Sequence, residues 1–162
     1  MITGKPLIDA SKDEWDDYAH LSCDYLRSKL CPFLVDNFGY KERYVKQHLN
    51  TGLAPTINAF TLRYDIYLRL FPVPEAGWPR ETLVIARIGF KQQRKGHGRN
   101  LMKLIASHAS EVGYKYIAIE AANENSSAFG KRFGLETTDN GRSWIGSVQS
   151  VQQALSVTTE SA

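Results

Sequence analysis

The chain has 162 residues, and its 20 Lys and Arg against 17 Asp and Glu give a formal net charge of +3 at pH 7. This length suits one compact domain that buries roughly 68–70% of its unfolded surface, so it needs no disulfide or structural metal. No segment approaches the roughly 20 apolar residues of a membrane span, and no leader pattern opens the chain, so we expect a cytoplasmic protein. Cys23 and Cys31 lack CxxC spacing and are expected to be reduced thiols.

The first half of the chain is predicted to contain two helices and strand structure. Ser11 and Glu14 have the spacing of a capping box, and apolar residues recur at helical spacing after them to about residue 30. Pro32 is expected to interrupt this helix because it lacks a backbone N–H. The other elements expected here are a short strand at 5–9, a helix at 40–49, and one strand or two at 57–71.

The second half predicts alternating strands and helices. Residues 82–90 are rich in β-branched side chains and predict a strand, and a helix follows from about Gly98 until Gly113 stops it. The order of elements predicts an α/β (α+β) domain over residues 1–150, with helices on both faces of the sheet. The remaining elements are a strand at 114–121, a short helix from Asn125, a hairpin of 135–137 and 143–145, and a flexible C-terminal tail at 151–162.

A basic loop between the 82–90 strand and the next helix predicts an anion site. Its sequence is Gln93-Arg94-Lys95-Gly96-His97-Gly98, and no acidic residue lies between Glu81 and Glu111. The first N–H groups of a helix lack intrahelical partners and the helix dipole is positive there, while glycines let a phosphate approach the backbone. We therefore expect a phosphate-rich cofactor, with a solvated basic helix face as the alternative.

These motifs resemble a known family. The run from Leu83 to Glu136 resembles the core of the GNAT superfamily of acetyl-CoA-dependent N-acetyltransferases. The loop matches the Q/R-x-x-G-x-G/A pattern that binds pyrophosphate in that family, and Asn123 followed by Phe133-Gly134-Leu135 matches its second signature. The resemblance implies a single-domain GNAT-like fold with a central, mixed, twisted sheet and splayed strands, and acetyl-CoA as the acyl donor.

The resemblance also implies roles for individual residues. The loop amides would hold the pyrophosphate of coenzyme A, and the end of the 82–90 strand would bind the pantetheine arm, with the Ile88 N–H polarising the thioester carbonyl. Phe129 would pack beside the pantetheine, although plain core packing explains it equally well. No metal is expected. The implied cofactor residues are Ile88, Gly89, Phe90, Gln93, Arg94, Lys95, Gly96, His97, Gly98, Arg99, Asn123, Ser126 and Phe129.

Acyl transfer to an amine needs a base, because an amine with a pKa of ~10.4 is neutral only ~0.04% of the time at pH 7, which costs about 4.6 kcal/mol. Two strand-end carboxylates are candidates, Glu120 and Glu81, and Glu81 stands one residue before the position used by some family members. Many members carry a proton-donating tyrosine where this chain has Gly130. Ser126 or Ser127 would be the substitutes.

The acceptor is expected to be an amine, either a small molecule or a protein amine. The acidic stretch from Asp9 to Asp17 would attract a cationic one, unless it is only a solvated helix start. The missing tyrosine also suggests a catalytically degenerate, acyl-CoA-binding module. A nucleic-acid-binding domain is the third reading, disfavoured because the basic stretch has no interleaved aromatic residues. We expect a monomer or homodimer with no membrane partner.

Overall fold

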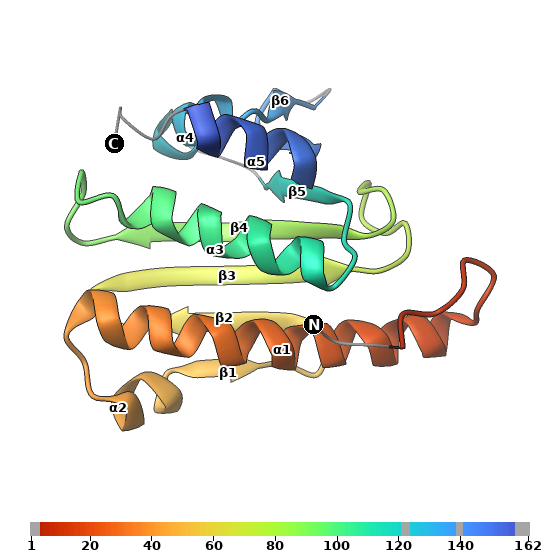
Figure 1. Ribbon diagram of the computed structural model, residues 1–162, viewed down its shortest axis with the longest axis horizontal. Coiled ribbons are helices and arrows are strands. Elements are labelled where there is room, and N and C mark those ends of the chain that lie inside the picture. The colour runs from red at the N-terminus through yellow and green to blue at the C-terminus, as the bar shows by residue number, and fades with distance from the viewer. Residues whose placement is uncertain (1–3, 121–123, 139–140, 158–162) are drawn as a thin grey trace.

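The computed structural model describes residues 4–120, 124–138 and 141–157, which form one seven-stranded mixed sheet with five helices (Figure 1). The strand order is β1-β2-β3-β4-β5-β7-β6, in which only β4 and β5 run parallel. The expected α/β class and mixed sheet are confirmed. The elements are α1 (Lys12–Phe38), α2 (Glu42–Gln47), β1 (Leu49–Thr51), β2 (Thr56–Phe60), β3 (Tyr64–Phe71), β4 (Thr82–Phe90), α3 (His97–Glu111), β5 (Tyr116–Ile119), α4 (Glu124–Arg132), β6 (Glu136–Thr137), β7 (Trp144–Ser147) and α5 (Val148–Val157).

Strand β4 separates from β5 halfway along its length. It has nine residues, but only Thr82 to Ile85 pair with β5, while the pairing with β3 continues to Phe90. The last bond between the two strands runs from the Glu120 N–H to the Ile85 carbonyl, at 3.1 Å. The expected splayed strands are therefore present, and the space between them is called the β4–β5 gap below.

The helices pack on one face of the sheet, so the prediction of helices on both faces is wrong. Figure 1 shows α1 and α3 side by side in front of the strands. The strand residues beneath them, such as Ile66, Leu83 and Ile85, belong to the same apolar cluster as the buried side chains of α1, α3 and α5. Among the described residues the opposite face carries only the small cluster of Trp78, Val84 and Ala118, packed with Phe71 and Ile145. That face, called the open face below, also carries Asn58, Asp65 and Arg69 from β2 and β3.

Helix α1 continues through Pro32, so the predicted interruption is wrong. It runs over 27 residues to Phe38, and Gly39 ends it in the left-handed region at φ 71°. Proline in a helix interior costs about 3 kcal/mol because one backbone bond is lost. The burial of Leu26, Leu30 and Leu34, each at most 1% exposed, on both sides of the proline outweighs this cost.

Three other expectations need correction or refinement. Residues 5–9 form no strand, and residues 57–71 form two strands joined by a tight turn. Residues 151–157 are not the expected flexible tail, because α5 continues to Val157 and buries Val151 and Leu155. The hairpin after α4 is confirmed by the pairing of β6 with β7. None of the helices in the described ranges is long and apolar enough to span a membrane.

The packing of α1 predicts a contrast between two leucines of this helix. Leu34→Ala, at a site that is 0% exposed, is expected to lower the free energy of unfolding by about 2–5 kcal/mol. Leu21→Ala, at a site that is 56% exposed, is the matched control and should change it by less than about 0.5 kcal/mol. Urea titrations of both variants measure the difference, and equal losses would contradict the placement of α1.

Candidate functional site

The backbone of β4 points the N–H and C=O groups of alternate residues into the β4–β5 gap. The Lys91 N–H donates to the Arg63 carbonyl, so in the antiparallel ladder Gly89 and Arg87 also bond to β3. The intervening residues, Ile88 and Phe90, therefore turn their N–H and C=O groups away from β3, toward the side that β5 has left. A register shift between Tyr67 and Leu68 changes which residues of β4 bond to β3 along the strand. Within the described ranges neither residue has a backbone partner across the gap, so an extended ligand arm there would meet the amide groups of both.

The loop after β4 leads directly into an uncapped helix start. Gly96 is the N-cap of α3 in the left-handed region at φ 78°, and no side chain caps the first turn. Arg94 also has a positive φ of 60°. Gln93, Arg94 and Lys95 are exposed, and among the described residues no carboxylate forms an ion pair with Lys91, Arg94 or Lys95. This uncapped helix start beside exposed cations has the features that an anion site needs, and anion binding there stays a prediction.

Gly98 lies directly against Phe129 of α4. A Cβ built on Gly98 would stand 2.9 Å from Cε2 of the Phe129 ring, which packs in turn on Phe133 at 4.7 Å between ring centroids. This contact brings the second predicted motif beside the first one. Gly89, in contrast, is extended, and a Cβ there would meet nothing within 4 Å, so its lack of a side chain has no steric reason here.

Two side chains of the α3 start point away from the loop. The His97 ring packs against Phe38 at 4.5 Å and Phe90 at 5.5 Å between centroids, joining the end of α1 to the end of β4. Arg99 donates from Nη2 to the carbonyl of Leu155 in α5, at 2.9 Å. Both side chains are held in tertiary contacts. Only the backbone groups of His97 and Arg99 are therefore left for the proposed cofactor.

Glu81 is removed from the candidate bases by its position. It precedes β4, seven residues before Ile88, and therefore lies about 20 Å from the open part of the gap. Its side chain is 5% exposed and forms ion pairs with Lys5 at 3.2 Å, Lys115 at 3.6 Å and Arg80 at 3.9 Å. A buried carboxylate held by three cations has a structural role at the closed end of the β4–β5 pair.

Glu120 lies at the root of the β4–β5 gap. It is the first residue after β5, and its backbone is bonded to Ile85. Its carboxylate accepts from Nη1 of Arg69 on the open face, at 3.3 Å, and its side chain is 31% exposed. Sequence reasoning missed Arg69, although β3 alternates buried and half-buried residues, which places Arg69 on the open face.

The position of the usual family tyrosine is filled by another residue. A Cβ on Gly130 would stand 3.3 Å from Cγ of Trp144 and 3.4 Å from Cδ1 of Ile119. The indole N–H of Trp144 donates to the hydroxyl of Ser127, at 3.3 Å. Ser126 is half-buried on the same helix. Asn123, the remaining predicted contact, lies outside the described residues.

Neither cysteine is available as a nucleophile. Both are free and buried. Burial raises the pKa of Cys23 to about 12 and also raises the pKa of Cys31. Thiolates are the reactive form of cysteine, so at neutral pH both thiols are inert. The described residues also contain no group of three or more His, Cys, Asp or Glu side chains that would hold a metal ion.

The acidic stretch at the start of α1 lies far from the β4–β5 gap. Tyr18 donates to the Val112 carbonyl at the end of α3, whereas Phe38 contacts His97 at its start, so the two helices run antiparallel. With 27 residues, α1 is about 40 Å long, and its acidic first turns stand at the end of the sheet opposite to the anion site. These residues therefore do not line the β4–β5 gap.

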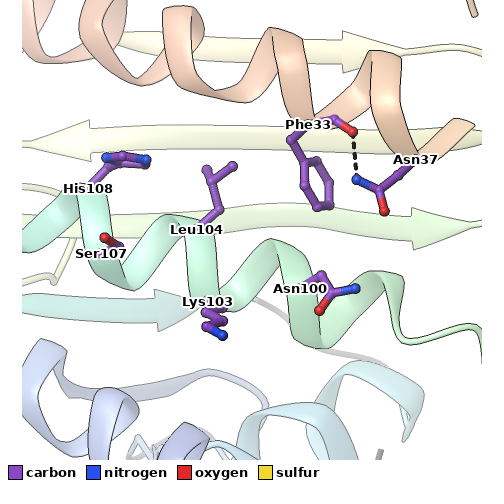
Figure 2. A pocket seen from close by; sticks show the side chains of 7 residues that line it. All are labelled: Phe33, Asn37, Asn100, Lys103, Leu104, Ser107 and His108. Atoms are coloured by element: carbon purple, nitrogen blue, oxygen red, sulfur yellow. Dashed lines mark hydrogen bonds between the residues drawn. The ribbon is translucent and has the colours of Figure 1, made fainter.

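A shallow groove lies between α1 and α3, away from the β4–β5 gap (Figure 2). Its volume is about 410 Å³. Phe33 and Asn37 enter it from α1, and Leu104 and His108 enter it from α3. Because the groove opens on the outer surface of the helical layer, it is separate from the backbone groups of β4. The anion site and the groove are thus two different features of α3.

The close contact at Gly98 predicts a coupled pair of substitutions. Gly98→Ala is expected to lower the free energy of unfolding by about 1–3 kcal/mol, because Phe129 must move. Gly89→Ala, where a Cβ meets open space, should cost little. In the background of Phe129→Leu, the cost of Gly98→Ala should shrink, and chemical denaturation of the single and double variants measures this coupling. Strict additivity would contradict the contact.

No family model and no curated protein matches this chain. Solved structures that are similar to it include AtaTR bound with acetyl-CoA (16% identity, 74% of this chain and 82% of that chain, TM-score 0.43) and a mutant of KacT (17%, 74% and 82%, 0.41). GCN5 from Tetrahymena is similar over 88% of this chain and 92% of its own, at 12% identity and a TM-score of 0.42. These are GNAT acetyltransferases. Because the TM-scores are below 0.5, we base the functional argument on the site itself.

Proposed function

We propose that the chain is an acetyl-CoA-dependent N-acetyltransferase in which an amine attacks the thioester directly. The observation that carries this proposal is the β4–β5 gap. The amide groups of Ile88 and Phe90 on β4 have no backbone partner there among the described residues, and they lie next to the uncapped, basic start of α3. A ligand with an amide-bearing arm and a pyrophosphate matches both features at once.

The residues at the gap fit such a ligand. The left-handed backbone at Gly96 and the missing side chain at Gly98 leave the α3 start open to a phosphate. Exposed Arg94 and Lys95 supply positive charge beside it. Acetyl-CoA would supply the activated acetyl group. The residues proposed to hold it are the backbone of Ile88–Phe90, the 93–98 loop, Phe129 and, as expectations from the sequence, Asn123 and Ser126.

Glu120 is the proposed base. It lies on the open face, the face that the helices leave uncovered, so an acceptor approaching from there meets its carboxylate. Ile88 lies three residues along β4 from the bonding partner of Glu120, about 10 Å away, so a chain of water molecules would relay the proton. The Ile88 N–H would polarise the carbonyl under attack.

The leaving thiolate departs without a tyrosine in this proposal. Trp144 and Ile119 pack where a side chain at Gly130 would lie, so that helix position carries no proton donor. A thiol pKa of ~8.5 allows the thiolate to leave with water alone. The same observation is what favours a second candidate, an acyl-CoA-binding module without catalysis.

Acetyl-CoA binding tests the site. Isothermal calorimetry should give micromolar affinity for the wild type, and Gly96→Glu should abolish it because a carboxylate would oppose the pyrophosphate. The matched control is Gly77→Glu, which adds the same charge at the same type of backbone, φ 84°, in another loop, and should bind normally. A wild-type protein without affinity for acetyl-CoA would contradict both the enzyme proposal and the binding-module proposal.

Turnover tests the base. With amines of several classes and a free-thiol readout, Glu120→Gln should lower kcat by about 100-fold while leaving acetyl-CoA affinity unchanged. Asp65→Asn, which removes another carboxylate of the open face, is the control and should stay within about twofold. Binding of acetyl-CoA without CoA release from any acceptor class would favour the module instead.

A further inference from the structure

A connected row of side chains on the open face ends at Glu120. Arg69 stands 3.3 Å from the Glu120 carboxylate, and its guanidinium lies 5.4 Å from the centre of the Tyr67 ring. Arg87 lies 4.8 Å from the centre of the same ring and pairs with Asp65 at 3.1 Å. Two cations thus contact one tyrosine, and each of them also contacts its own carboxylate.

This row of side chains restricts the motion of the Arg69 side chain more than an ordinary surface ion pair would. An exposed ion pair is usually mobile, because two long side chains must be held in one geometry. Here the guanidinium has an aromatic contact on Tyr67 as well as its carboxylate partner. Its planar fork is also suited to holding a carboxylate in a fixed orientation. The Arg69 guanidinium is therefore held at two points, by the Tyr67 ring and by the Glu120 carboxylate.

The Glu120 carboxylate is held by Arg69 in the described part of the chain. Within the described ranges, the pair with Arg69 is the single polar contact of its carboxylate. Its backbone is anchored by the bond to Ile85, but its side chain has three rotatable bonds. Without Arg69 the carboxylate would sample positions away from the β4–β5 gap.

We propose that Arg69 is a positioning residue, which holds the Glu120 carboxylate at the root of the gap, and that the contact with Tyr67 steadies it there. This inference rests on the proposed function, because it assigns Arg69 a role through the proposed base. Arg69 itself does not touch the reacting atoms. It lies on β3, a strand that contributes none of the residues implied by the family motifs.

A mutant cycle with a defined acceptor tests the proposal. The acceptor is n-butylamine with acetyl-CoA, and released CoA thiol is measured for Arg69→Gln, Arg69→Lys, Glu120→Gln and the double variant. We expect Arg69→Gln to lower kcat about tenfold with KM for acetyl-CoA unchanged, and Arg69→Lys to recover part of the rate. The double variant should be no slower than Glu120→Gln alone. Arg87→Gln, which loses a cation from the same ring, should retain kcat within about twofold.

The outcomes separate the two proposals. An unchanged kcat in Arg69→Gln, or an equal loss in the Glu120→Gln background, overturns the role of Arg69 while the base remains. An unchanged kcat in Glu120→Gln overturns the base, and the role of Arg69 with it. Absent acetyl-CoA binding overturns the enzyme itself.

A second measurement does not depend on turnover. Relaxation of the side-chain ¹⁵Nε–H group should show Arg69 ordered in the wild type and mobile in Glu120→Gln, whereas Arg87 stays unchanged. Arg43, an exposed residue of α2, gives the reference for a free arginine. If Arg69 is as mobile as Arg43 in the wild type, the proposal is wrong regardless of the acceptor.

Discussion

The separation of β4 from β5 after Ile85 is the constraint on which the rest of the site depends. Parallel strands normally continue to exchange backbone bonds, and unpaired groups in a sheet are costly to bury. Here the register shift opposite Tyr67 and Leu68 sends the groups of Ile88 and Phe90 toward the gap, while β3 keeps the strand extended. The gap and the start of α3 are therefore neighbouring parts of the proposed site on a single stretch of chain.

The parts of this site that the sequence predicts are those encoded by neighbouring residues. A β-branched run, two glycines with a basic loop, and a following amphipathic pattern predicted the β4–α3 unit, and the structure has it with Gly96 in the left-handed region. Glu120 was placed at a strand end for the same reason, because strand length follows from local pattern. Local signals of this kind do not depend on the remaining packing.

Tertiary packing decided the features that the sequence did not predict. Pro32 remains helical because buried leucines stand on both sides of it. His97 turns toward Phe38, a residue 59 positions earlier, and no local pattern reveals such a contact. The pairing of Arg69 with Glu120 joins two strands that are not adjacent in the sheet, so it follows only from the twist and order of the strands.

The Glu81 cluster gives the gap a fixed end. Its carbonyl accepts from the N–H groups of Lys115 and Tyr116, at 2.9 and 3.1 Å, while its carboxylate holds Lys5, whose ammonium also reaches the Gly113 carbonyl. The two diverging strands are thus clamped together at one end by a segment from the start of the chain. The gap is therefore closed at the end where Lys5 packs and open at the end where α3 begins.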